Sequence, residues 1–141
     1  MIQFNFKMIP PIPLGIHYKM WIKAIIRSEG LVPGNIEYVF CHDSFLLEVN
    51  QHHLNHDTYT DIITFDYRDG DLVSGEIYIS VDRIEENAAH FQVLWEEELW
   101  RVMAHGILHL CGYKDKNEKD AVVMREKENR AINLFVKEYK K

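Results

Sequence analysis

The spacing of apolar residues divides the chain into short strands and amphipathic helices. Residues 2–7 alternate between apolar and polar side chains, which predicts a strand, whereas residues 17–28 carry tryptophan and isoleucine at the helical period. The same patterns predict strands at 36–41, 61–67 and 76–80, and helices at 43–50, from Ser80 or Asp82 to about residue 90, at 95–111 and at 118–139.

This order of elements indicates an α+β fold. We predict a single domain over residues 1–141, in which a small mixed sheet of about four strands packs with about five helices. No internal repeat or low-complexity linker divides the sequence. A chain of 141 residues is long enough to bury about two-thirds of the surface that its unfolded form exposes.

Composition narrows the class of protein further. Apolar residues make up 47% of the chain, which excludes intrinsic disorder. The longest apolar runs are interrupted by Lys23 and Arg27, so they fall short of a membrane span, and residues 1–7 lack the features of a secretory signal. The two cysteines, Cys41 and Cys111, are typical of free thiols in a reducing compartment. We therefore expect a cytoplasmic protein that does not bind membranes.

The strongest candidate for chemistry lies at the end of the helix predicted at 95–111. His105 and His109 are four residues apart, so their side chains share one face of a helix with Cβ atoms roughly 5–6 Å apart. Both rings can then reach one metal ion at about 2.0–2.1 Å. Gly112 stops the helical pattern, and Asp115 is the first residue after the turn that offers a third ligand. Three ligands and an open position are typical of a catalytic zinc.

Spacing alone does not identify a metal site, because His52 and His56 are separated in the same way. The surroundings of the two pairs differ. On a helical wheel the apolar residues of 95–111 fill a broad arc, and His105 and His109 fall on the opposite side. Two interpretations stay open at this point: a metal site, or a solvated helix face that carries two histidines.

The glycine between the histidines also bears on the chemistry. Gly106 costs about 1 kcal/mol of helix propensity relative to alanine, so it has a packing or functional reason. We interpret it as leaving room for the ion or its substrate. Zincin peptidases carry their general base, a glutamate, at this position, which argues against an ordinary metalloprotease.

Three segments, in order along the chain, resemble one known family. HGILHLCGY at residues 105–113 is similar to the pattern His-Gly-x-x-His-x-x-Gly-Tyr-Asp-His of the YbeY family, bacterial rRNA maturation factors described as metal-dependent endoribonucleases. Asn50 with residues 57–65, DTYTDIITF, resembles the family's Asn…Asp-x-Pro-Thr-Asp-Val-Leu-Ser-Phe, and residues 75–80 resemble its Gly-Asp-Ile-x-Ile strand.

The resemblance implies a function and a set of ligands. It implies a zinc-dependent endoribonuclease that acts on single-stranded rRNA, in 3′-end maturation of the 16S rRNA and in ribosome quality control, with the small ribosomal subunit and its assembly proteins as partners. In the family three histidines bind zinc. By the resemblance, His105, His109 and Asp115 here are both the metal ligands and the catalytic residues, holding one Zn²⁺.

Two departures from the family pattern matter. The third histidine of the pattern falls on Asp115, and a carboxylate oxygen also binds zinc, although a harder ligand set leaves room for other divalent transition metals. An arginine that the family carries near its active site falls on Leu54. His53 and His56 are nearby candidates for a replacement role.

A net charge of −6 is unusual for a protein that binds RNA, so this function requires a local basic patch. The candidates are Arg101, Lys114, Lys116, Lys119, Arg125 and Arg130. Glu98 shares the histidine face and lies too far away to be a ligand, so we interpret it as an outer residue that positions a ligand or water.

The mechanism that the sequence predicts is metal-assisted hydrolysis of an RNA phosphodiester, with water or the 2′-hydroxyl as nucleophile. Two alternatives stay open: a non-nucleolytic ribosome assembly factor with a structural metal, and a metallohydrolase that acts on a small molecule or peptide. The missing arginine at position 54 favours the first, and the acidic net charge favours the second.

Overall fold

A computed structural model describes residues 1–54 and 61–140 of the chain, except for the side chains of residues 52–54. Within these residues, a four-stranded mixed sheet forms the base of the fold. The strands are β1 (Ile2–Phe6), β2 (Val32–Cys41), β3 (Ile62–Asp66) and β4 (Leu72–Ser80), in the spatial order β1-β2-β4-β3. Strand β2 pairs in parallel with β1 and β4, and only β3 runs antiparallel. The predicted α+β class and mixed sheet are confirmed.

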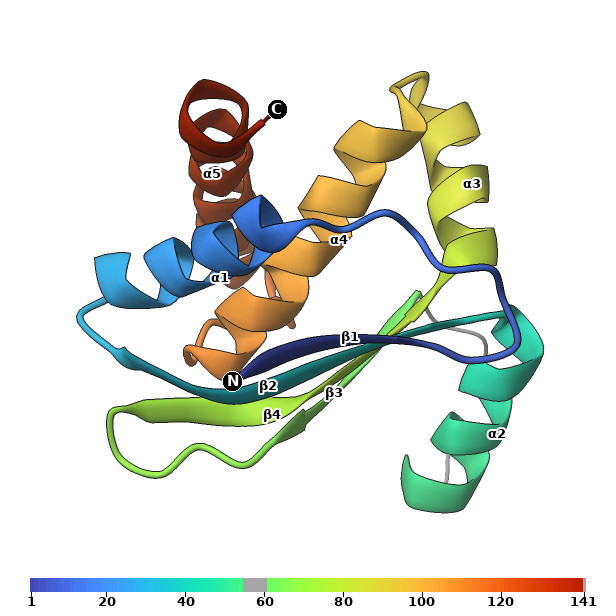
Figure 1. Cartoon of the computed structure of the whole chain (residues 1–141), viewed down its shortest axis with the longest axis horizontal. Helices are drawn as coiled ribbons and strands as arrows, with labels where there is room; N and C mark the ends of the chain where they lie inside the picture. The colour runs from blue at the N-terminus through green and yellow to red at the C-terminus, as the bar shows by residue number, and fades with distance from the viewer. Residues whose placement is uncertain (55–60, 141) are drawn as a thin grey trace.

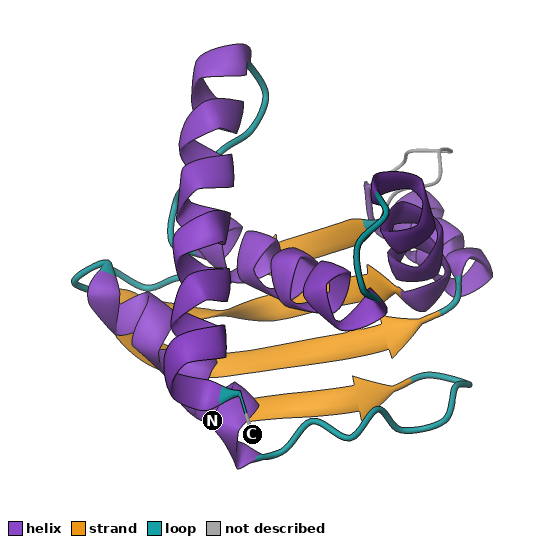
Figure 2. Ribbon diagram, turned by 90° about the horizontal axis from the view of Figure 1, so that it is seen from above, coloured by secondary structure: helices purple, strands orange, loops and turns teal. Residues whose placement is uncertain are grey.

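The helices lie on both faces of this sheet. They are α1 (Ile16–Ser28), α2 (Asp43–Leu54), α3 (Val81–Phe91), α4 (Trp95–Leu110) and α5 (Glu118–Leu134), which continues as a π-helical turn over Phe135–Tyr139. Figures 1 and 2 show α1 and α4 across one face with α5 beyond them, whereas α2 covers one end of the other face. Among the described residues, no helix combines the length and the hydropathy needed to span a membrane.

Helix α4 is the centre of the larger core. The arc predicted from the wheel is buried, with Met103 and Ile107 fully inaccessible to solvent. The backbone carbonyl of Met103 accepts a hydrogen bond of 2.9 Å from the buried Tyr38 hydroxyl, which ties the helix to β2. Because α4 contacts the sheet, α1, α3 and α5, only one stripe of the helix, with Glu98, Arg101, His105 and His109, is left for polar chemistry.

Strands β2 and β4 begin earlier than the sequence predicts. The register between them shifts from Pro33 to Ile36, so the Pro33-Gly34 pair is an irregular part of β2. Proline is tolerated at a bulge because its missing N–H is not needed there. The last predicted helix is confirmed over its whole length once the π-helical turn is included.

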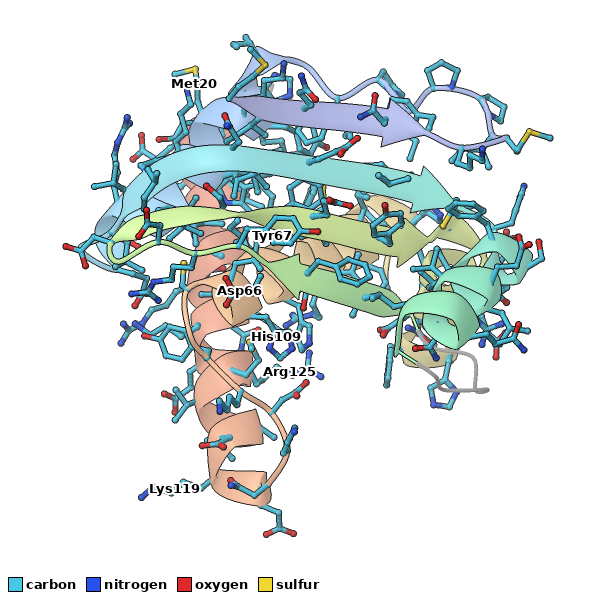
Figure 3. All side chains as sticks on the ribbon, turned by 90° about the horizontal axis from the view of Figure 1, so that it is seen from below. Met20, Asp66, Tyr67, His109, Lys119 and Arg125 are labelled. Atoms are coloured by element: carbon cyan, nitrogen blue, oxygen red, sulfur yellow. The ribbon has the colours of Figure 1, made fainter. Side chains whose placement is uncertain are left out.

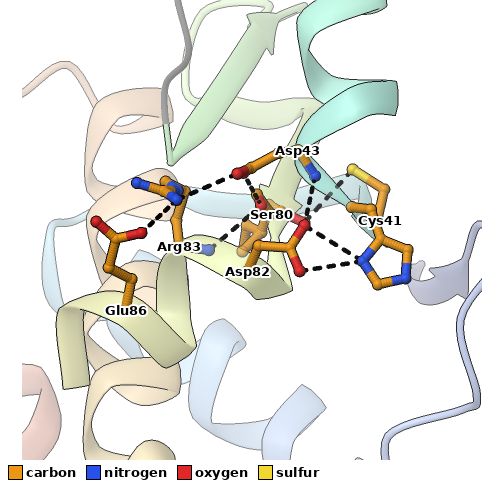
Figure 4. Close-up of polar contacts among 8 residues, drawn as sticks. Cys41, Asp43, Ser80, Asp82, Arg83 and Glu86 are labelled. Atoms are coloured by element: carbon orange, nitrogen blue, oxygen red, sulfur yellow. Dashed lines mark hydrogen bonds and ion pairs between the residues drawn. The ribbon is translucent and has the colours of Figure 1, made fainter. Parts of the chain in front are cut away.

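The helices that follow β2 and β4 share their N-terminal caps (Figure 4). The Asp82 carboxylate accepts a hydrogen bond of 2.8 Å from the backbone N–H of Asp43, the first residue of α2. Ser80 is the N-cap of α3, where its hydroxyl accepts from the N–H of Arg83 and donates to the Asp43 carboxylate. The hydrogen bond from the Asp43 N–H is the main reason that the pKa of Asp82 is lowered. This network fixes where α3 starts and therefore how the chain enters α4.

Gly106 has a packing role, which corrects the prediction that it makes room for the ion or substrate. A Cβ at this position would lie 2.7 Å from Cγ2 of Ile77 and 2.9 Å from Cδ1 of Ile62. Both distances are shorter than real Cβ contacts, so α4 can approach the sheet this closely only because residue 106 has no side chain.

We expect Gly106→Ala to destabilise the fold by about 1–3 kcal/mol, because overpacking against Ile77 and Ile62 outweighs the gain in helix propensity. Ile62→Val removes the methyl group at 2.9 Å and should restore part of the loss in the double variant. Urea unfolding measures the free energy of unfolding of each variant, and the dependence of that free energy on urea concentration should stay unchanged. A Gly106→Ala protein as stable as the wild type would contradict the packing role.

Candidate metal centre

Three side chains converge where α4 ends. His105 and His109 occupy the last turns of the helix, and Gly112, with φ at +109°, reverses the chain so that Asp115 returns to the same place. The two Nε2 atoms lie 2.9 Å apart, and Oδ2 of Asp115 lies 3.2 Å from that of His105 and 3.6 Å from that of His109. One donor atom of each residue fits within 4.8 Å of the others. The structure thus brings together all three residues that the sequence singled out.

The hydrogen-bond partners of the two Nδ1 atoms fix the orientation of each histidine ring. Nδ1 of His109 lies 2.9 Å from the carbonyl oxygen of Tyr113, and Nδ1 of His105 lies 2.6 Å from Oε2 of Glu128. Neither acceptor has a proton to give, so each Nδ1 carries the hydrogen of this bond and each Nε2 faces inward.

This arrangement fits a metal ion. Two ring nitrogens at 2.9 Å need either a shared proton or a metal ion between them, and the Asp115 carboxylate adds a third electron-rich group to the same space. Two imidazoles and a carboxylate are an ordinary donor set for Zn²⁺ and related divalent ions. Their fractional exposure of 20–40% leaves the site open to solvent on one side.

Glu128 from α5 is the residue that sequence reasoning missed. Its side chain is 7% exposed. One carboxylate oxygen contacts His105, and the other lies 3.0 Å from the guanidinium of Arg101. The signal was available, because Glu128 stands in line with the buried Met124 and Ala131 on the inner face of α5. A carboxylate within a buried stripe needs such partners.

The charges of this group support one another. Burial disfavours the imidazolium of His105, yet the pKa of His105 is raised above its ordinary value because Glu128 and Asp115 favour positive charge. Burial likewise favours neutral Glu128, yet its pKa is lowered because His105 and Arg101 donate hydrogen bonds to it. Glu128 is therefore ionised and holds the His105 ring in one orientation.

The other predicted residues fall in several places. Arg101 is held by Glu128 and Asn129, and Arg125, 3.8 Å from Glu128, is more than half exposed. Arg125 lines the same cavity as His105, and Figure 3 shows Lys119 at the far tip of the molecule. Lys114 and Lys116 are exposed beside Asp115, and Arg130 lines a separate hollow between α1 and α5.

Cys111 and position 54 are the two remaining positions that the sequence analysis named. Cys111 packs against the core, and burial raises the pKa of its thiol to about 11, which agrees with a structural role. The structure does not describe the side chains at position 54 and at the nearby histidines, which are Leu54, His52, His53 and His56. The predictions for these residues therefore lie outside the described part of the chain.

Glu128→Gln keeps the shape of the side chain but gives up the charge that orients His105. We expect metal affinity to fall roughly 10–100-fold, because outer hydrogen-bond partners of ligating histidines have effects of this size. Competition with a chromophoric chelator measures the affinity. Glu126→Gln, an exposed position on the same helix, is the matched control. Equal affinities in all three proteins would contradict the orienting role.

Comparisons with known proteins point in one direction. Residues 14–136 match the sequence model of a family described as endoribonuclease YbeY. Proteins of that name from Flavobacterium psychrophilum and Flavobacterium johnsoniae are 51% and 50% identical over 135 residues, which cover 96% of this chain and 96–97% of theirs. The relative from Porphyromonas gingivalis is 47% identical over 82% of this chain and 76% of its own length.

The fold has a counterpart among solved structures. The solution structure of a Thermotoga maritima protein superimposes with a TM-score of 0.69 and 28% sequence identity. The match covers 97% of this chain and 91% of that protein. The likeness therefore extends over the sheet and all the helices around the candidate metal centre.

Proposed function

The chain belongs to the YbeY endoribonuclease family, and on that premise we propose that it cleaves single-stranded rRNA with one divalent metal ion, zinc, held by His105, His109 and Asp115. Its relatives are named endoribonucleases, and the family's role in rRNA maturation carries over to this chain at about 50% identity. We place its action in the cytoplasm, on the 3′ end of the 16S rRNA and in quality control of the small ribosomal subunit. We treat residues 1–141 as one metallohydrolase domain.

One observation supports the metal most strongly. Both histidines have their Nδ1 atoms engaged by acceptors that are fixed in the fold, so the two Nε2 atoms and the Asp115 carboxylate meet at one point. A solvated helix face with two histidines would not need a buried carboxylate such as Glu128 behind one ring.

The residues around this point divide the work of phosphodiester cleavage. A divalent ion supplies Lewis acidity to a phosphate oxygen and acidifies a water molecule. His105 and His109 would hold the ion, while Glu128 and the Tyr113 carbonyl keep the rings from turning. Arg125, which is largely exposed and only loosely paired, provides positive charge for an adjacent phosphate.

We expect the metal affinity of Asp115→Ala to fall more than roughly 100-fold, because a direct ligand is lost. Removal of an outer hydrogen bond to a ligand lowers the affinity by at most about that factor. Asp115→His, which restores the residue of the family pattern, should retain the metal. Metal analysis of the purified proteins tests this, with Asp71→Ala at an exposed turn as control. Unchanged metal content in Asp115→Ala would exclude Asp115 as the third ligand.

Cleavage of RNA tests the activity itself. His109→Ala should slow hydrolysis of a labelled single-stranded RNA at least about 100-fold, since several kcal/mol of transition-state stabilisation depend on the ion. Chelation should abolish wild-type cleavage, and added Zn²⁺ should restore it. Equal cleavage by the wild type and His109→Ala would show that the nuclease activity does not belong to this site.

A further inference from the structure

A cavity of about 420 Å³ opens beside His105, between α3, α4 and α5. Its apolar wall consists of Phe91, Val93 and Val102, and Phe91 leaves more than half of its surface exposed. Polar groups line the remainder, among them Asn87 and Glu98. A volume of this size, with an apolar wall and a few converging polar groups, is typical of a site for a small planar ligand.

The charges of the lining disfavour a phosphate inside the cavity. Carboxylates come from Asp61, Glu97, Glu98 and Glu128, whereas the cations are only Arg101 and Arg125. The guanidinium of Arg101 is already paired with Glu128. A nucleotide that enters this cavity would therefore present its base, with its phosphate directed toward the metal centre and Arg125.

Glu98 is the unusual member of the lining. Its side chain is more than nine-tenths buried, and no hydrogen bond or ion pair to it is found within the described part of the chain. Burial raises the pKa of Glu98, and the negative charge of Asp61 adds to this effect while Arg101 opposes it. The residue as a whole is buried, but its carboxyl oxygens are not among the buried atoms without a partner, so they face the cavity and can accept a hydrogen bond from a ligand.

We propose that this cavity binds one base of the RNA substrate and selects a base with an exocyclic amine, whose N–H donates to the Glu98 carboxyl oxygen. The inference rests on the RNA substrate proposed above. Glu98 lies seven residues before His105 on α4, about 10 Å along the helix, a span comparable to one nucleotide. The bound base would thus belong to a nucleotide next to the phosphate that is cleaved.

The chemistry of the bases gives the preference its direction. Cytosine, adenine and guanine each offer an amine on the edge used for pairing, and a carboxyl oxygen accepts from it in either protonation state. Uracil offers one N–H between two carbonyl oxygens, which repel the lone pairs of Glu98. Phe91 provides a face on which any base can stack, so it contributes affinity but no selection.

Nucleoside 5′-monophosphates test this without cleavage. We titrate the zinc-loaded protein with CMP, AMP, GMP and UMP and follow binding by NMR. The dissociation constant for UMP should be about tenfold larger than those for the three nucleotides that carry an exocyclic amine. Glu98→Gln replaces one acceptor with a donor and should remove most of this difference. Glu96→Gln, an exposed neighbour on the same helix, should keep it, and Phe91→Ala should weaken all four nucleotides alike.

Equal binding of the four nucleotides by the wild type would overturn the inference, and so would full discrimination in a folded Glu98→Gln protein. The wild-type ranking alone decides the matter if Glu98→Gln does not fold. Selective binding by a protein that fails to cleave RNA would retract the proposed activity but keep the base site. RNA cleavage by a protein that binds the four nucleotides equally would keep the proposed activity and exclude the base site.

Discussion

The candidate metal centre depends on one constraint, the engagement of each Nδ1 atom by an acceptor that is part of the fold. Glu128 reaches His105 from α5, and the carbonyl of Tyr113 reaches His109 from the turn after α4. Without these two hydrogen bonds the rings could rotate or exchange tautomers, and the Nε2 atoms would have no fixed direction. The proposed binding of an ion by both rings depends on that orientation.

The scaffold delivers these acceptors through close packing. Gly106 lets α4 lie against Ile62 and Ile77, while Met124 and Ala131 hold α5 against α4 and bring Glu128 within reach of His105. The shared caps at the starts of α2 and α3 fix the far wall of the cavity. Binding groups that sit on buried helices are positioned more precisely than groups on loops.

Sequence periodicity was enough to predict the elements, and the sequence singled out the cluster of His105, His109 and Asp115 that the structure shows, whereas their role as metal ligands stays a prediction. Local patterns failed where the cause was distant: the bulge at Pro33 depends on β4, and the packing role of Gly106 depends on β3 and β4. Glu98 was interpreted as a residue that positions a ligand or water, and the contact with the His105 ring is made instead by Glu128, from a helix that follows α4 in the sequence. A helical wheel describes one helix and contains nothing about its neighbours.

X-ray absorption spectroscopy of the zinc-loaded protein tests the central claim most directly, because it counts the imidazoles around the ion. Two imidazole nitrogens at about 2.0–2.1 Å, with oxygen donors completing a shell of four and no sulfur, are the expected result for His105, His109 and Asp115. A shell that contains sulfur, or one that lacks imidazole scattering, would contradict the proposed metal centre.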